Sequence, residues 1–218
     1  MELTAKELSF SYGDGGRQIF QNISFRAGST ERVGLMAGSG FGKTTLCRIL
    51  AGYERPQSGA VYLDEKPLLS LRGKCPVQMI FQHPEQSVDP VRRMGHVLKE
   101  GGVQLGEMTE RLGIRREWLS RYPRELSGGE LQRFCIARAL GEGTRFILAD
   151  EISTMLDLAT QKEIWLFLLE ETRRRGIGLI AASHSEGLLR EVCTRIMRLE
   201  RGRAVPLTDN RMEGSIWM

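Results

Sequence analysis

One short segment constrains the fold of this chain more than any other. Residues 36–46 read MAGSGFGKTTL and directly follow the apolar run Arg32–Leu35. The run predicts a buried strand, the glycines favour a tight loop, and Thr44–Ala51 is expected to form a helix that ends at Gly52. A strand, a glycine-rich loop and a helix in this order are the context that a phosphate-binding loop requires.

The frame of a phosphate loop is a glycine, four residues, and then glycine, lysine and serine or threonine. In this chain the frame covers Ala37–Thr44, and its last three residues match. Its first residue does not, because Ala37 stands in place of glycine. The extra methyl group is acceptable if residue 37 keeps a negative φ. A plain glycine-rich turn remains the alternative.

The residue types in this loop suit an anionic ligand. Glycines can turn successive backbone N–H groups toward phosphate oxygens, and the following helix adds its positive N-terminal end. Lys43 can reach the β- and γ-phosphates, and the Thr44 hydroxyl can ligate Mg²⁺. The expected nucleotide contacts are Gly38, Ser39, Gly40, Gly42, Lys43, Thr44 and Thr45.

Strand-like and helix-like segments alternate along the rest of the chain, which indicates a parallel sheet in an α/β core. The expected core strands are 32–36, 76–81, 146–149 and 178–183, and the expected helices are 44–51 and 160–175. Two short edge strands, 7–12 and 19–25, are expected to flank a turn at 13–16.

Residues 86–121 differ in character from the rest. They are charged, interrupted by glycines, and show helical patches without a clear strand. We interpret them as the start of an inserted, mainly helical lobe that ends near Ala139. The tail after Pro206 is polar and is expected to be loosely held.

Composition excludes several classes of protein. The 218 residues are 41% hydrophobic and 27% charged, which is ordinary for a globular protein. A net charge of +4 is too mild to indicate nucleic-acid binding but would suit the cytoplasmic face of a membrane. Apolar stretches such as Ile164–Leu169 are too short to span a bilayer, and the N-terminus lacks a signal-peptide core. The scattered cysteines are expected to be free thiols: Cys47, Cys75, Cys135 and Cys193.

A second segment, LSGGELQRFCIARAL at Leu126–Leu140, adds another anion-binding feature. A serine before two glycines exposes backbone N–H groups at the start of an amphipathic helix. Taken alone, the segment is better explained as a capped amphipathic helix with the serine as its N-cap. The segment nevertheless closely resembles the signature sequence of the ATP-binding cassette (ABC) family, and it lies where that family has it, between the two nucleotide motifs.

The resemblance to the ABC family extends over nearly the whole chain. FILADE resembles the Walker B strand, whose residues Phe146–Ala149 are apolar because both faces of the strand are buried. By this resemblance Asp150 serves Mg²⁺, directly or through water, and Glu151 polarises the attacking water. Thr154–Asp157 resembles the loop that contacts a partner subunit. Ile152 replaces the usual proline, which makes the local turn less rigid.

Three further residues match family positions. His184, after GLIAAS, matches the switch histidine that contacts the γ-phosphate and holds the water. Gln82, in VQMIFQHP, matches the glutamine at the joint between core and lobe, which reaches Mg²⁺ and the water. Tyr12 matches the aromatic residue on which adenine stacks. Without the resemblance each has an ordinary structural interpretation. His83 and His96 match no catalytic position.

The resemblance implies an α/β fold with a P-loop NTPase core, a parallel sheet, an N-terminal antiparallel β subdomain and an inserted helical lobe. It implies one ATP-binding domain over 1–218, with the core at 1–85 and 140–218 and the lobe at 86–139. The implied activity is hydrolysis of ATP to ADP and phosphate, coupled to transport. Two cassettes would meet head to tail, so that ATP bound to one also contacts the partner's signature residues: Ser127, Gly128 and Gly129.

The implied partners are integral membrane permease subunits and a second cassette, identical or related, at the cytoplasmic face of the cell membrane. RYPRELSGGE and FQHPEQSVDP resemble the subunits that import peptides, nickel or metal chelates.

Two alternatives stay open. A cassette ATPase without a permease usually carries two cassettes or a coiled coil, and no heptad pattern is evident here. A phosphate-loop kinase would explain Ala37–Thr44 but not the signature or His184. The bulky Phe41 is expected to point away from the phosphates.

Overall fold

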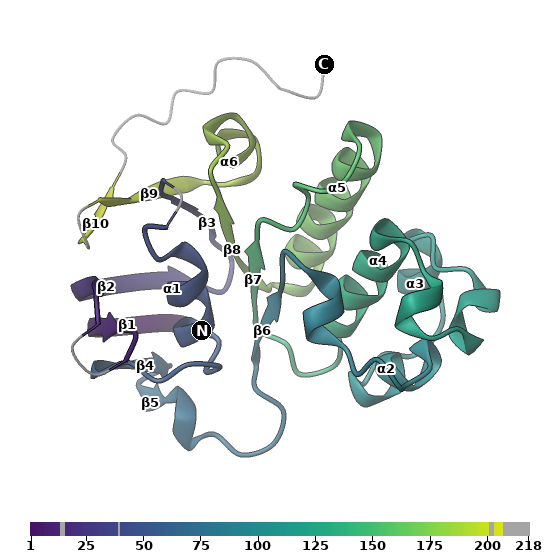
Figure 1. Cartoon of the computed structure of the whole chain (residues 1–218), viewed down its shortest axis with the longest axis horizontal. Coiled ribbons are helices and arrows are strands. Elements are labelled where there is room, and N and C mark those ends of the chain that lie inside the picture. The colour runs from purple at the N-terminus through teal and green to yellow at the C-terminus, as the bar shows by residue number, and fades with distance from the viewer. Residues whose placement is uncertain (14–15, 39, 201–202, 207–218) are drawn as a thin grey trace.

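The computed structural model describes residues 1–13, 16–38, 40–200 and 203–206. Its first sheet is four-stranded and antiparallel, in the order β2-β1-β4-β5 (Figure 1). Its strands are β1 (Glu2–Ser11), β2 (Gln18–Gly28), β4 (Ser58–Leu63) and β5 (Lys66–Pro67). The expected N-terminal antiparallel β subdomain is therefore present.

The second sheet has six strands in the order β10-β9-β3-β8-β7-β6. All neighbours are parallel except β10 and β9, which are antiparallel. Its strands are β3 (Arg32–Met36), β6 (Val77–Ile80), β7 (Phe146–Asp150), β8 (Gly178–Ser183), β9 (Arg195–Glu200) and β10 (Arg203–Pro206). Every residue of β7 and β8 is buried, which explains why both strands are continuous apolar runs in the sequence.

The helices separate into those of the core and those of the inserted segment. The core carries α1 (Lys43–Leu50), α5 (Leu158–Arg175) and α6 (Glu186–Val192), and the segment between β6 and β7 carries α2 (Met94–Glu100), α3 (Glu107–Arg111) and α4 (Gly128–Ala139). Short 3₁₀ helices lie at 68–70, 84–87, 116–120 and 123–125. Residues 86–139, all described, contain no strand, and Figure 1 places α2, α3 and α4 together on the side of the molecule away from β1 and β2.

Local sequence explains where the two longest helices begin. Ser127 caps α4: its hydroxyl accepts the Glu130 N–H, and the Glu130 carboxylate accepts the Ser127 N–H. This reciprocal pair satisfies two N–H groups that the helix would otherwise leave unpaired. Asp157 caps α5 in the same sense, since its carboxylate accepts the Thr160 N–H at 3.0 Å.

Alternate side chains of the central strands build two separate hydrophobic clusters. In β7, Ile147 and Ala149 belong to the cluster that includes α4 and α5, whereas Phe146 and Leu148 belong to the cluster that includes α1 and the antiparallel sheet. This period of two follows from strand geometry. The six-stranded sheet therefore lies between the two hydrophobic clusters.

The structure corrects part of the predicted strand arrangement. The strand predicted at 7–12 is not an edge strand, because β1 pairs with both β2 and β4. Strands β4, β5, β9 and β10 and helix α6 were not predicted. SGAVYL in β4 is short and its exposed start hides the apolar alternation. Residues 14–15 of the predicted turn and the tail after Pro206 lie outside the described residues.

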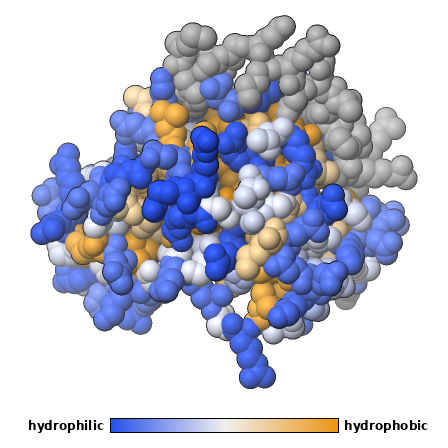
Figure 2. Space-filling model, turned by 180° about the vertical axis from the view of Figure 1, so that it is seen from behind, coloured by the Kyte–Doolittle hydropathy of each residue, from blue (hydrophilic) through white to orange (hydrophobic). Residues whose placement is uncertain are grey.

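The visible surface of the molecule is mostly hydrophilic. Hydrophilic side chains dominate the face opposite to the view of Figure 1, and hydrophobic ones form small separate patches there (Figure 2). Within the described residues, no helix combines the length and apolar character needed to cross a bilayer. All four cysteines are free, which confirms the prediction of thiols.

Candidate active site

A cavity of about 400 Å³ opens beside the loop that joins β3 to α1. Ligand pockets typically measure about 300–1,000 Å³. Among the described residues, its lining consists of Tyr12, Ile19, Gly38, Gly40, Gly42, Lys43, Thr44, Thr45, Gln82, Glu151 and His184. All except Ile19 are predicted site residues. Ile19 escaped prediction because an isoleucine in a strand carries no functional signal.

The loop geometry depends on glycine at two positions. Gly40 and Gly42 have φ of 77° and 88°, in the left-handed region that favours glycine. A Cβ on Gly42 would also lie 2.4 Å from the side chain of Ile19, so a larger residue cannot fit. Ala37 is not among the described residues with positive φ, so its methyl group meets the condition set above. Ser39 lies outside the described residues.

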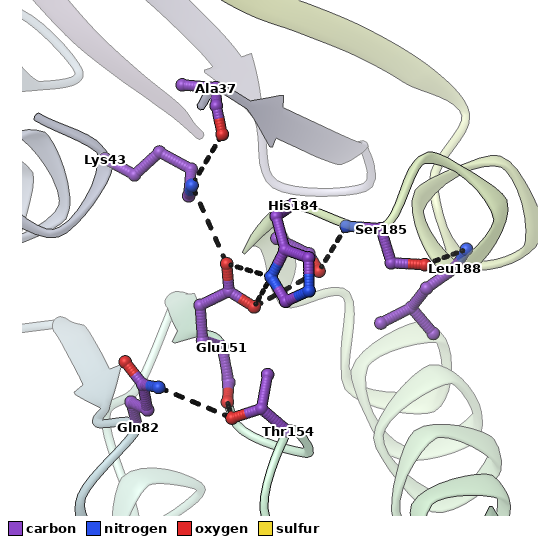
Figure 3. Close-up of polar contacts among 9 residues, drawn as sticks. Ala37, Lys43, Gln82, Glu151, Thr154, His184, Ser185 and Leu188 are labelled. Atoms are coloured by element: carbon purple, nitrogen blue, oxygen red, sulfur yellow. Dashed lines mark hydrogen bonds and ion pairs between the residues drawn. The ribbon is translucent and has the colours of Figure 1, made fainter. Parts of the chain in front are cut away.

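Lys43 lines the cavity, and its side chain reaches toward Ala37 and Glu151 (Figure 3). Its ammonium donates to the Ala37 carbonyl at 2.7 Å and forms an ion pair with Glu151 at 3.7 Å. Both side chains are only 9% exposed, so water screens the pair weakly. An entering phosphate would meet this ammonium first and would compete with Glu151 for it.

Glu151 is held in an unusual backbone conformation at the end of β7. Its φ is 51°, and its N–H donates to the Ala182 carbonyl of β8 at 2.9 Å. Its carboxylate lies 3.1 Å from Nδ1 of His184 through both oxygens. Because a carboxylate only accepts hydrogen bonds, this contact is a hydrogen bond in the tautomer that carries the imidazole proton on Nδ1. Glu151 thus lies between Lys43 and His184 (Figure 3).

Asp150 has the environment expected of a metal ligand. It is 1% exposed, and its Oδ1 has no hydrogen-bond partner among the described residues. Burial raises the pKa of this carboxyl, and a hydrogen bond from Thr44 opposes that shift. Mg²⁺ typically binds one or two carboxylates together with waters and substrate phosphates. An orphaned carboxylate oxygen beside the Thr44 hydroxyl fits Mg²⁺ brought in with a nucleotide.

Gln82 and Tyr12 line the cavity, and each follows a strand of a different sheet: Tyr12 comes after β1 and Gln82 after β6. The Gln82 amide nitrogen donates to the Thr154 hydroxyl at 3.4 Å, which leaves the amide oxygen free of that bond. The Tyr12 hydroxyl lies 2.8 Å from that of Thr45, and its ring meets Phe10 edge-on at 4.9 Å. Tyr12 is therefore fixed at the rim with half of its surface exposed.

The signature residues are not among the described residues that line the cavity. Ser127 and Gly128 are exposed at the start of α4, and a Cβ on Gly128 would meet nothing within 4 Å. Phe41 also does not line the cavity. Its ring is 45% exposed and lies against Gly38, so the expectation that it points away from the phosphates stays a prediction.

The loop at Thr154–Asp157 combines anchored and exposed positions. Ile152, which stands where the family has proline, is 3% exposed and packs in the cluster with α4 and α5, so burial rather than ring geometry fixes the turn. Met155 is 70% exposed. Hydrogen bonds from Thr160 lower the pKa of Asp157, which keeps this cap charged.

The fold and the cavity together define a class of protein. A parallel sheet, a glycine-rich loop leading into α1 and an acidic pair at the end of another strand are the parts of a phosphate-loop nucleotide-binding protein.

Comparison with known proteins identifies the family. The family model described as ABC transporter matches residues 20–154. The chain is 32% identical to the nickel import ATP-binding protein NikE of Pseudomonas putida, over 88% of this chain and 77% of that protein. It is 31% identical to the methionine import ATP-binding protein MetN of Caulobacter vibrioides, over 93% of this chain and 65% of that protein.

Solved structures agree on the fold. The dimeric ATP-binding cassette MJ0796, bound to ADP and phosphate, superposes with a TM-score of 0.82 at 24% identity, over 97% of this chain and 100% of that one. The cassette cbiO1 of Clostridium perfringens gives 0.75 at 24% identity, over 93% and 86%. The chain belongs to the ABC transporter family, and its fold is that of the solved ATP-binding cassettes.

Proposed function

We propose that this chain is the ATP-hydrolysing subunit of an importer, and that the residues of the cavity described above are its catalytic site. The observation that carries the proposal is the placement of Glu151 between Lys43 and His184, in a cavity that also contains the glycine-rich loop. A carboxylate in this position can polarise a water molecule, while the two neighbouring groups can engage a phosphate.

The phosphate loop binds the nucleotide in this proposal. Backbone N–H groups of the loop and the N-terminus of α1 face the phosphates, and Lys43 neutralises the β- and γ-phosphate charge. Thr44, Asp150 and Gln82 would hold Mg²⁺, which neutralises developing phosphate charge when bound. Tyr12 stacks on adenine at the rim.

Hydrolysis then depends on the groups around the γ-phosphate. Glu151 orients and polarises the attacking water, and His184 contacts the γ-phosphate and holds that water in line. Since Lys43 pairs with Glu151 at 3.7 Å, nucleotide binding would transfer Lys43 to phosphate and release the carboxylate for water. Binding of the substrate itself would therefore prepare the base.

Assembly follows from the position of the signature residues. Ser127, Gly128 and Gly129 lie outside the cavity of their own chain, so we propose that they complete the site of a second cassette, identical or related, in a head-to-tail pair. Residues 1–85 and 140–218 would form the core of each cassette, and the lobe at 86–139 would pass the motion of the pair to an integral membrane permease. The complex would lie at the cytoplasmic face of the membrane.

The direction of transport rests on the subgroup resemblance. RYPRELSGGE and FQHPEQSVDP resemble segments of peptide, nickel and metal-chelate importers, and a NikE relative supports import of nickel or a related solute. A MetN relative at similar identity leaves the cargo open among these small solutes. The family assignment disfavours the kinase alternative, whereas a non-transport cassette ATPase remains the second candidate.

Co-purification tests the transport function. The chain is isolated with a tag from membranes of the cell that makes it, and associated integral proteins are identified; a permease and a cassette are expected. Phosphate release from ATP is measured on the same preparation. Lys43→Ala should abolish phosphate release. Lys66 is exposed, and Lys66→Ala is the matched control that should leave phosphate release unchanged. Turnover without any permease would favour the non-transport alternative, and a phosphorylated product would favour a kinase.

A further inference from the structure

We propose that Ser183 is a positioning residue that aims the Glu151 carboxylate at the attacking water. This inference rests on the proposed function, because it assigns the residue that orients its base. No motif predicted Ser183, since a serine at the end of a strand is a common feature of α/β proteins.

The hydrogen bonds of Ser183 determine where its proton points. Ser183 is the last residue of β8 and is 2% exposed. Its hydroxyl oxygen accepts the backbone N–H of Ser185 at 3.1 Å, and the hydroxyl donates to Oε2 of Glu151 at 3.3 Å. An N–H group cannot accept, so the single hydroxyl proton is available for the carboxylate. The Ser185 amide thus orients Ser183, and Ser183 in turn orients Glu151.

The three donors around the Glu151 carboxylate differ in what else they face. Lys43 and His184 line the nucleotide cavity, and both are proposed to engage phosphate. Ser183 is not among the described lining residues of that cavity; it lines a separate cavity of about 260 Å³ that also borders Glu151 and His184. When phosphate takes Lys43, the bond from Ser183 is kept, because among the described residues Ser183 does not line the nucleotide cavity. It can therefore hold the carboxylate during catalysis.

The backbone reinforces this contact. The Glu151 N–H donates to the carbonyl of Ala182, the residue before Ser183, at 2.9 Å. The end of β8 thus binds Glu151 twice, once through its main chain and once through its carboxylate. Glu151 keeps a left-handed φ of 51° under this restraint, and strained backbone persists where surrounding contacts fix it. Strand β8 sets both the position and the direction of the base.

A merely structural role makes different predictions. In that case Ser183 would only satisfy the Ser185 N–H at the turn into α6, and its loss would lower stability without acting through Glu151. Ser183→Thr and Ser183→Val separate the two roles, because these side chains have nearly the same shape and only threonine keeps the hydroxyl. Ser185→Ala is the matched control: it removes the hydroxyl that accepts the Leu188 N–H as the cap of α6, whereas the bond to Glu151 comes from Ser183.

Steady-state phosphate release by the purified ATP-hydrolysing preparation measures the effect. Ser183→Val is expected to lower kcat about 10-fold, as for loss of a hydrogen bond to a charged group, with the KM for ATP within about two-fold of wild type. Ser183→Thr should restore most of kcat. Ser185→Ala should lower the melting temperature but leave kcat unchanged. Equal kcat for the valine and threonine variants, with both folded by circular dichroism, would overturn the proposal.

A double-mutant cycle with Glu151→Gln gives an independent test. If Ser183 acts through the carboxylate, Ser183→Val should cause no further loss in the Glu151→Gln background, measured as single-turnover phosphate release. A further 10-fold loss there would overturn the proposal. The proposed function is tested separately: wild-type release that Lys43→Ala fails to abolish would overturn that function and this inference with it.

Discussion

Replacing Glu151 with glutamine changes one charge at the centre of the site and keeps the size of the side chain. The proposed base is lost, and removal of a general base typically slows a reaction by about 10² to 10⁴. This range corresponds to about 3 to 5 kcal/mol in the barrier. Hydrolysis by Glu151→Gln should therefore fall at least about 100-fold.

The same substitution should strengthen ATP binding rather than weaken it. Glu151 is an anion 3.7 Å from the Lys43 ammonium, and it competes with phosphate for that charge. The carboxylate would also repel a phosphate oxygen: two like unit charges about 4 Å apart repel by about 4 kcal/mol at an effective dielectric constant of 20, and neutralising Glu151 removes that repulsion. Lys43, Thr44 and Asp150 remain in place. Nucleotide affinity should rise while turnover disappears.

Two measurements on the same sample check this reasoning. Phosphate release reports turnover, and light scattering with and without ATP and Mg²⁺ reports assembly, because trapped nucleotide should hold two cassettes together through the partner's Ser127 and Gly129. Glu163→Gln, on the exposed side of α5, is a matched control with the same chemical change. Unchanged turnover, or weaker ATP binding, would refute the argument. Lost turnover without a dimer would keep the catalytic role and favour a pair with a related cassette.

Four further outcomes are expected. Ala37→Gly should change ATP affinity by no more than a few-fold by equilibrium dialysis, because the carbonyl that accepts the lysine and the loop glycines are unchanged. Asp150→Asn should raise the melting temperature at pH 7. The pKa of the native Asp150 carboxyl is raised above its ordinary 3.8, so the folded state is fully stabilised by the protonated carboxyl below pH 3.8 and loses that stability as pH rises through the native pKa. Asparagine is always neutral and keeps this stability at pH 7, and its advantage over aspartate should vanish at pH 3. Glu171→Ala should cost about 3 kcal/mol in urea unfolding, since this 1% exposed carboxylate pairs with three arginines of α3 and α5. Burial raises the pKa of the Cys193 thiol to about 12, so iodoacetamide at pH 8 should modify half-buried Cys75 first and Cys193 only on unfolding.

The sequence predicted best where local chemistry and burial agree. The strand at 178–183 was predicted with its observed bounds, because both of its faces are buried and its apolar run is uninterrupted. The glycine-rich loop was predicted because φ near 80° at Gly40 and Gly42 requires that residue type. The short strand β4 was missed because only its second half is buried, which leaves too few apolar positions to show a period.

Contacts between distant segments were beyond prediction without a family pattern. His184 and Glu151 are 33 residues apart, yet their side chains meet at 3.1 Å because β7 and β8 are neighbours in the sheet. Nothing in either local segment specifies that pairing. Ser183 shows the limit most clearly, since its contact with Glu151 depends on the register of the two strands and not on a recognisable residue pattern.

The position of the signature helix bears on how the proposed pair would form. Gly129 lies next to the loop that follows the base, since a Cβ there would be 3.5 Å from the Leu156 side chain. Met155 in that loop and Leu158 after it are 70% and 78% exposed, so two large apolar side chains close together in sequence face outward. An apolar loop beside the signature would gain free energy on contact with a second cassette. Since the signature lies outside its own cavity, the same contact would complete the partner's site, so hydrolysis and assembly would depend on one surface.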